Sequence, residues 1–404
     1  ITNICSESND FVCEFGLDLL GCYMTKCKLG DICEIVSGST PKTSIAEYWD
    51  GDVKWITPAE LSDDTYIIMD SVRKITKLAV EKTGLRSIPK GTVILSSRAP
   101  IGKVAIAGCE LYCNQGFKNL ICSDVINNKY LYWFLRGNTI FLNSLGRGAT
   151  FKEISKSIVS EIEINIPSIM QQKKVVENLE KLNRIVSIRK QELQLLDQLV
   201  RGRFVELFGD MIINHNGWEN VLLGEVCDVR DGTHDSPQYY SEGYPLVTSK
   251  NVTGGKIEFI DCSLICEEDF NKINQRSKVD YGDILMPMIG TVGNPVIVDI
   301  DEKFAIKNVA LIKFRDNSVV INSFIKALLE SDYFDRAVIS KVRGGTQKFI
   351  SLGDIRKLEI YLPPIELQNQ FADFVKQIDK SKFGHLSMLT TIKSAYEQQT
   401  FMYP

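Results

Sequence analysis

Residues 29–40 read LGDICEIVSGST, and residues 223–234 read LGEVCDVRDGTH. The two stretches align without a gap at a separation of 194 residues, with four identical positions and four exchanges between similar side chains. Agreement at that distance indicates that one domain has been duplicated. Because 404 residues are too many for one ordinary domain, two copies also account for the length of the chain.

The repeat continues beyond this stretch. GTVILSSRAPIGKVAI at 91–106 faces GDILMPMIGTVGNPVIV at 282–298, and INIPSIMQQ at 164–172 faces IYLPPIELQ at 360–368. A period near 195 residues is too long for a solenoid unit or a propeller blade. We therefore predict two similar globular domains rather than a repeat array.

Within each copy, short β-rich runs are separated by Gly, Pro, Asn and Asp. Strands are predicted at Val93–Ser96 and Asp283–Pro287, and helices at Lys129–Arg136 and Val320–Ser331. This mixture of short strands and occasional helices is typical of an α+β domain.

A different pattern follows each domain. From Pro167 to about residue 208, apolar residues recur at alternating steps of four and three, which predicts a coiled-coil helix of about 40 residues, roughly 60 Å long. A second and less regular stripe follows Pro364. The predicted stripe residues are Val175, Leu179, Leu182, Val186, Leu193, Leu196 and Val200 in the first helix, and Phe371, Ile378, Leu389 and Ile392 in the second.

The composition excludes several classes of protein. Hydrophobic residues make up 44% and charged residues 24%, the net charge is −4, and no apolar run is long enough to span a membrane. The first residues have no basic segment before an apolar core, so we expect a cytoplasmic protein. The 11 cysteines form no C-x-x-C pair and only three histidines are present, so we expect no metal site.

Motifs for catalysis are also missing from the sequence. There is no G-x-x-x-x-G-K-[ST] phosphate loop and no Asn/Asp-Pro-Pro-aromatic run of the kind that an adenine methyltransferase needs. The chain is therefore expected to be non-catalytic and to hold no cofactor of its own.

The sequence resembles the S (specificity) subunits of type I restriction-modification enzymes. The resemblance covers nearly the whole chain after residue 28, and the proline-led helix start IPxxxQ is among its more specific features. It rests on LGDICEIVSGSTPKT at 29–43, YWDGDVKWITPAEL at 48–61, GTVILSSRAPIGKVAI at 91–106, INIPSIMQQKKVV at 164–176, LLDQLVRGRFVELFGD at 195–210 and YLPPIELQNQF at 361–371.

The resemblance implies a subunit that reads an asymmetric, two-part site in duplex DNA. Such a subunit would recruit two M (modification) subunits, which methylate adenine, and through them R (restriction) subunits. S-adenosylmethionine, ATP and Mg²⁺ are then expected on the partner subunits and not on this chain.

The repeat and the resemblance together predict the organisation of the chain. We expect an α+β protein in which two similar target-recognition domains are joined by two long antiparallel coiled-coil helices with pseudo-two-fold symmetry. The predicted parts are an N-terminal segment packing on the helical scaffold (1–27), the first recognition domain (28–166), the first connector helix (167–210), the second recognition domain (211–362) and the second connector helix (363–404).

Candidate DNA-binding residues are polar or basic side chains on loops, chiefly where the two copies diverge. In the first domain they are Lys42, Thr57, Arg98, Lys103, Lys118, Arg147 and Lys152. In the second domain they are His234, Thr248, Lys250, Asn251, Asn294, Lys307, Arg343, Gln347 and Lys348.

Other interpretations stay open at this point. About half of these residues are expected to be ordinary surface charges or structural polar groups, and Thr57 and Thr248, which match between the copies, favour a structural or phosphate-binding role. The chain could equally serve a modification-only system. A coiled-coil protein-interaction scaffold and a nuclease using Asp301 and Glu302 are remoter alternatives.

Overall fold

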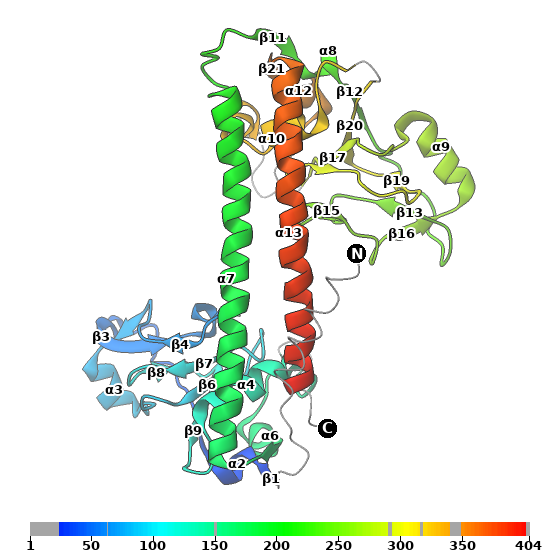
Figure 1. Ribbon diagram of the computed structural model, residues 1–404. Coiled ribbons are helices and arrows are strands. Elements are labelled where there is room, and N and C mark those ends of the chain that lie inside the picture. The colour runs from blue at the N-terminus through cyan, green and yellow to red at the C-terminus, as the bar shows by residue number, and fades with distance from the viewer. Residues whose placement is uncertain are drawn as a thin grey trace. The chain divides into compact units, whose positions relative to one another are not determined.

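The computed structural model describes residues 24–62, 64–148, 152–289, 293–315, 318–339 and 349–400, with side chains described up to residue 392. The chain divides into two compact units, one of residues 1–189 and 387–404 and the other of residues 190–386. Each unit contains one α+β domain and parts of the two long helices α7 (Ile169–Phe208) and α13 (Ile365–Thr400) (Figure 1). The predicted duplication of an α+β domain, with two long helices, is confirmed.

The first domain contains a five-stranded sheet of order β2-β9-β6-β7-β4 and a three-stranded sheet of order β5-β3-β8. A separate antiparallel pair, β1 with β10, precedes α7. The elements are β1 (Thr25–Lys28), α2 (Leu29–Ile32), β2 (Cys33–Ser37), η1 (Ala46–Tyr48), β3 (Trp49–Ile56), η2 (Pro58–Glu60), β4 (Ile67–Ile68), β5 (Lys74–Ile75), α3 (Lys77–Thr83), β6 (Val93–Ser96), β7 (Val104–Ala107), β8 (Tyr112–Cys113), β9 (Phe117–Cys122), α4 (Asn128–Gly137), α5 (Thr139–Ser144), α6 (Lys156–Ser160) and β10 (Glu163–Ile166).

The second domain repeats this plan with a four-stranded sheet of order β12-β20-β17-β18 and a three-stranded sheet of order β16-β13-β19. The pair β11 with β21 precedes α13, as β1 with β10 precedes α7. The elements are β11 (Glu219–Leu222), α8 (Leu223–Val226), β12 (Asp228–Asp231), β13 (Tyr244–Val247), β14 (Val252–Thr253), β15 (Lys256–Ile257), β16 (Ser263–Ile265), α9 (Glu267–Ser277), β17 (Ile284–Pro287), β18 (Val296–Ile297), β19 (Ala305–Ile306), β20 (Val309–Lys313), α10 (Asn322–Leu329), α11 (Asp332–Ala337), α12 (Leu352–Arg356) and β21 (Glu359–Leu362).

The glycines shared by the two opening stretches have a steric role. A Cβ atom on Gly38 would lie 1.9 Å from the carbonyl oxygen of Asn114, and one on Gly232 would lie 2.1 Å from that of Ile306. In both copies the chain leaving β2 or β12 therefore passes directly over the turn that precedes β9 or β20. Only glycine fits at such a close approach of two backbone segments.

A buried glutamine joins each domain to its long helix. The Gln172 side-chain amide donates to the carbonyl oxygens of Pro167 and Val125, both at 2.9 Å, and its oxygen accepts from the Asn127 N–H at 2.7 Å. The side chain is fully buried. Gln172, which directly follows the last residue of the IPxxxQ motif, Gln171, therefore ties the first turn of α7 to the loop before α4.

Gln368 makes the same three contacts in the second copy. Its amide donates to the carbonyl oxygens of Pro363 at 2.9 Å and Val319 at 3.0 Å, and its oxygen accepts from the Ile321 N–H at 2.9 Å. We call these two buried arrangements the glutamine junctions, with Gln172 at the centre of the first and Gln368 at the centre of the second.

Within the second unit, α7 and α13 run antiparallel. The rings of Phe204 and Phe371 lie 5.6 Å apart, and further along the pair the Lys382 ammonium lies 2.7 Å from a carboxylate oxygen of Asp197. Residue numbers therefore fall along α7 as they rise along α13. This arrangement agrees with a coiled-coil pair and gives the predicted antiparallel direction.

The predicted stripe residues of the long helices are all buried or half-buried. Some of them also pack against domain cores rather than only between helices. Leu179 belongs to the core of the first domain, with Val175 packed on it, and Val200 packs on the core of the second. A helix that holds a domain as well as a partner helix needs apolar residues for both.

Residues 1–23 of the predicted N-terminal segment lie outside the described residues. Its last residues, Thr25–Cys27, form most of β1, which pairs with β10 in the first domain. Cys27 packs against the core of the same domain.

Candidate nucleic-acid interface

Loops from distant parts of the sequence meet at one edge of the first domain. The strands β2, β3, β6 and β8 end there, and β7 and β9 begin there. Backbone hydrogen bonds from Ser39 to Cys113 at 2.9 Å, and from Ser97 to Gly116 at 2.7 Å, tie the loops together. We call this the first loop edge; it consists of residues 38–43, 57–61, 97–103, 113–117, 147–148 and 152–153.

Two charged side chains of this edge, Arg98 and Glu153, form one cluster with Lys118, which was predicted to lie on a loop but is the second residue of β9. Arg98 Nε donates to Glu153 Oε2 at 2.9 Å, and Lys118 Nζ lies 3.2 Å from both Glu153 Oε1 and Ser97 Oγ. The Lys118 side chain is only 6% exposed, whereas that of Arg98 is 45% exposed. Burial alone would raise the pKa of the Glu153 carboxyl, but the hydrogen bonds from Lys118 and Arg98 outweigh it and lower that pKa.

The other candidates of the first domain have different surroundings. Lys103 donates to the carbonyl oxygen of Leu61 at 2.5 Å, which ties two loops of the edge. The side chains of Lys42, Arg147 and Lys152 are exposed, and the backbone of Arg147 pairs with that of Glu153.

The two threonines shared by the copies have a structural role. The N–H and hydroxyl of Thr57 donate to Glu60 Oε1 at 2.8 and 3.2 Å. The N–H and hydroxyl of Thr248 donate in the same way to Asn251 Oδ1, at 3.0 and 2.8 Å. Each threonine thus caps the turn that follows β3 or β13, and Asn251, which is buried, spends its side-chain oxygen on that cap.

The second domain has a corresponding edge. Backbone hydrogen bonds from Thr233 to Ile306 at 3.0 Å and from Lys307 to Val247 at 2.9 Å bring its loops together. We call this the second loop edge; it consists of residues 232–237, 248–252, 288–289, 293–294 and 306–309.

His234 is held on both sides of its ring. Nε2 lies 2.8 Å from Asp231 Oδ2, and Nδ1 lies 2.7 Å from Asn308 Oδ1. Arg276, on α9, contacts the other oxygen of the buried Asp231 carboxylate. Because both ring nitrogens are engaged, His234 has a fixed orientation on the second loop edge.

The remaining candidates of the second domain lie on the same edge or outside the described residues. Lys307 donates to Ser236 Oγ at 2.7 Å. Lys250 is exposed, and Asn294 is exposed with a φ of 55°, which asparagine tolerates better than most residues. Arg343, Gln347 and Lys348 lie outside the described residues.

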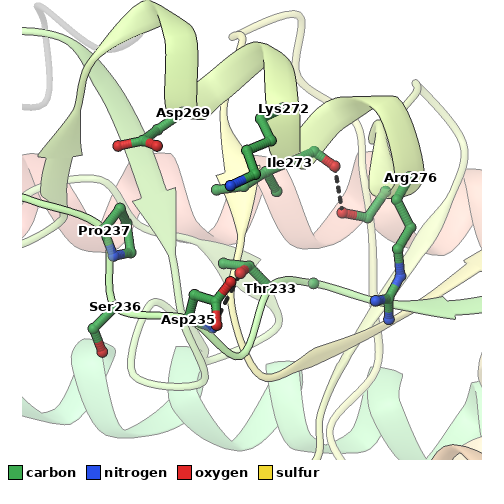
Figure 2. A pocket seen from close by; sticks show the side chains of 10 residues that line it. Thr233, Asp235, Ser236, Pro237, Asp269, Lys272, Ile273 and Arg276 are labelled. Carbon is green, nitrogen blue, oxygen red and sulfur yellow. Dashed lines mark hydrogen bonds between the residues drawn. The ribbon is translucent and has the colours of Figure 1, made fainter.

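A cavity of about 290 Å³ opens between the 232–237 loop and α9. Figure 2 shows Lys272 and Arg276, one helical turn apart, extending from α9 on the side that faces Thr233 and Asp235. Neither basic residue was predicted from the sequence. The only local signal was their spacing of four residues on an amphipathic helix; their proximity to the loop depends on the pairing of β13 with β16.

The described residues contain no group of three or more His, Cys, Asp or Glu side chains that could hold a metal ion. No helix within the described ranges is long and apolar enough to cross a membrane.

Comparison with known proteins agrees with this architecture. The sequence model of one protein family, the type I restriction modification DNA specificity domain, matches the chain twice, at residues 23–198 and 215–386. The MjaIX type I restriction enzyme specificity subunit of Methanocaldococcus jannaschii is 31% identical over 399 residues, covering 91% of this chain and 89% of that protein. The EcoBI specificity subunit of Escherichia coli is 20% identical, covering 72% and 68% of the two chains.

Solved structures share the fold. An S subunit of a type I restriction-modification system from M. genitalium has a TM-score of 0.53 at 15% identity, and covers 96% of this chain and 97% of its own. A chain from a study of complex assembly and conformational transition of the type I R-M system has a TM-score of 0.56 at 19% identity, with 93% and 96% covered.

Proposed function

Because the chain belongs to the type I restriction-modification DNA specificity family, whose members are non-catalytic specificity subunits, we propose that it selects the target of such a system by reading a bipartite, asymmetric site in duplex DNA. Each loop edge would read one half of that site. Two modules that read separate half-sites require a fixed spacing between them, and the two long helices are suited to set it.

One observation carries this proposal: the two copies keep the same scaffold but carry different side chains at the same edge. The glutamine junctions and the close-approach glycines are identical in both. At the loop edges, by contrast, Thr40 contacts Gln115 in the first copy where His234 contacts Asn308 in the second. A protein that reads two different half-sites needs this combination.

The repeated scaffold also supports the proposed partners. Two identical methyltransferase subunits would require two similar docking surfaces, and the repeated scaffold that the buried junctions hold in place would present a matched pair. We propose that two such subunits bind, and that restriction subunits join through them. S-adenosylmethionine, ATP and Mg²⁺ would then be bound by these partners.

The predicted DNA-binding residues divide into two proposed roles. Lysines and arginines with exposed side chains on the edges, such as Lys42, Arg147, Lys152 and Lys250, suit phosphate contacts. Arg98, which is held by a neighbouring side chain through Nε alone, suits a base contact, because a fixed side chain discriminates between bases at lower entropic cost.

The test is to co-express the chain with its methyltransferase subunit in a host that lacks adenine methylation, and to map methyladenine across the genome. The expected result is one asymmetric, two-part motif with a fixed gap. An assembled complex whose methyltransferase is active but which methylates no such motif would contradict the proposal.

A domain exchange makes the test sharper. Replacing residues 28–166 by those of a relative with a different target should change one half of the motif and leave the other half and the gap unchanged. A change in both halves would show that the loop edges do not read independently.

A further inference from the structure

We propose that Arg98 reads a guanine in the half-site recognised by the first domain, with Glu153 as the positioning residue that holds its guanidinium. This inference rests on the proposed function, because it names the base that one loop edge selects. It assigns a different role to each of the three residues of the charged cluster, Arg98, Lys118 and Glu153.

Within the part of the chain that the structure describes, only Nε of the Arg98 guanidinium has a side-chain partner. A guanidinium carries five N–H donors in a planar fork, and Glu153 Oε2 accepts from the Nε–H, which is the donor nearest the backbone. The two terminal nitrogens can therefore make the paired contact with guanine O6 and N7 that arginine most often makes in the major groove. The side chain is 45% exposed at an edge where strands end.

Lys118 contacts the other oxygen of the Glu153 carboxylate. It is nearly buried and lies 3.2 Å from Glu153 Oε1, opposite the oxygen that holds Arg98. The carboxylate is therefore fixed at both oxygens before DNA arrives. Two cations share one anion, so the cluster keeps a net positive charge, which favours approach to DNA. Neutralising the charge of Lys118 would require Glu153 alone. The presence of Arg98 on the same carboxylate therefore indicates a further role for Arg98.

The second domain shows that the fold does not need this cluster. Arg98 and Glu153 pair through their backbones, and at the corresponding place in the second domain Ile289 and Phe349 pair in the same antiparallel way. The adjoining backbone hydrogen bond is also present in both copies. The Ile154 N–H donates to the carbonyl oxygen of Ser97 at 2.9 Å, and the Ile350 N–H donates to that of Met288 at 3.0 Å. The same backbone bridge forms with apolar side chains, so the charges of the first copy serve another purpose.

The first experiment repeats the methylation map with Arg98→Ala in the complex with its methyltransferase subunit. The expected result is that one G·C position, in the half-site changed by the exchange of residues 28–166, loses its preference while the other half and the gap remain. A wild-type half-site made only of A·T pairs, or an Arg98→Ala motif identical to the wild-type motif, would overturn the inference.

The second experiment measures binding directly, and also applies if Arg98→Ala abolishes methylation. Duplexes carry 7-deazaguanine, which lacks the N7 acceptor, at each guanine of the half-site in turn. The wild-type complex should bind one of them at least about fivefold more weakly than the normal duplex. If Arg98→Ala still binds DNA, it should bind both duplexes alike. A wild-type complex that is indifferent to every 7-deazaguanine would overturn the inference.

The positioning role of Glu153 has its own measurement. Glu153→Gln keeps an acceptor for the Arg98 Nε–H, whereas Glu153→Ala removes it. Glu153→Ala should therefore lose most of the discrimination against 7-deazaguanine, and Glu153→Gln should restore part of it. Equal discrimination by both variants and the wild type would reduce Glu153 to a structural residue. If the wild-type complex produced no methylation, the proposed function itself would have failed, which is a different result from all of these.

Discussion

The glutamine junctions and the loop edges behave differently under the same duplication. At the junctions, Gln172 and Gln368 make three corresponding hydrogen bonds whose lengths differ by no more than 0.2 Å. At the edges, a charged cluster around Glu153 in one copy corresponds to apolar side chains in the other. At the junctions, buried backbone N–H and carbonyl groups need hydrogen-bond partners, and few side chains can supply them. At the loop edges, which we propose to contact DNA, the side chains of the two copies are free to differ.

The strongest test of the conserved half of this comparison is Gln368→Leu. The substitution leaves the Ile321 N–H and the carbonyl oxygens of Val319 and Pro363 without their side-chain partner in a buried site. Three unsatisfied groups at the low end of about 1–3 kcal/mol each lower the free energy of unfolding of the second unit by at least about 3 kcal/mol. Urea denaturation followed by hydrogen exchange of peptides from α10 measures it.

The matched control for that substitution is Gln370→Leu, two residues along α13, where the side chain is exposed. It should change the same free energy by less than about 0.5 kcal/mol. Gln172→Leu should reproduce the large effect in peptides from α4. If only one of the two junctions responded, they would not be equivalent.

The close-approach glycines give the next largest effect. Gly38→Ala and Gly232→Ala each place a Cβ about 2 Å from a carbonyl oxygen, so two backbone segments must separate, at about 2–3 kcal/mol in each domain. Gly202→Ala is the control, because a Cβ there meets nothing within 4 Å and alanine favours a helix; it should stabilise slightly. Thermal unfolding of the three variants measures the difference, and two glycine variants with unlike effects would break the equivalence of the copies.

Much of the conserved half could be predicted from the sequence, because its signals are local. The strand predicted at Val93–Ser96 has those bounds in the structure, and the helix start predicted at the IPxxxQ motif is confirmed by α7, which begins at Ile169. The role of the residue after the motif, Gln172, was not predictable. The partners of Gln172 lie in the loop before α4, 45 and 47 residues away, and only the tertiary fold brings them together.

The divergent half was less predictable for the same reason. Arg98 and Lys118 were candidates by residue type, although Lys118 lies within β9 and not on a loop. Glu153, which holds both, was not a candidate. Lys272 and Arg276 were missed because their helix reaches the loop edge through strand pairing far along the chain. The roles of all these residues in DNA binding stay predictions.

A smaller effect is expected in the pH dependence of stability, because the cluster around Glu153 is charged whereas the corresponding side chains of the second domain are apolar. Because the folded-state pKa of Glu153 lies below its ordinary value, its ion pairs stabilise the first domain above about pH 4.3 and are lost as the pH falls through the folded pKa. At pH 7, Glu153→Gln should cost about 0.5–1 kcal/mol, a low value because the carboxylate is 36% exposed. Urea denaturation from pH 7 to pH 3 should show the difference between Glu153→Gln and the wild type shrinking. Glu161→Gln, in an exposed ion pair with Lys28, is the control, and a difference that stayed constant down to pH 3 would exclude the ionised cluster.

The smallest effect is expected from α9, which has a cavity and two basic residues facing the second loop edge. If Lys272 grips a phosphate, Lys272→Ala should weaken binding equally for all sequences and reduce the slope of log affinity against log salt by about 0.9. The methylation motif should not change, because a phosphate contact carries no sequence information. Lys326→Ala, on α10 and ion-paired with Glu330, should leave both slope and motif unaltered. A Lys272→Ala complex with an unchanged slope but an altered base preference would instead place α9 among the base-reading elements, and the second domain would then read from a helix where the first reads from the loop that carries Arg98.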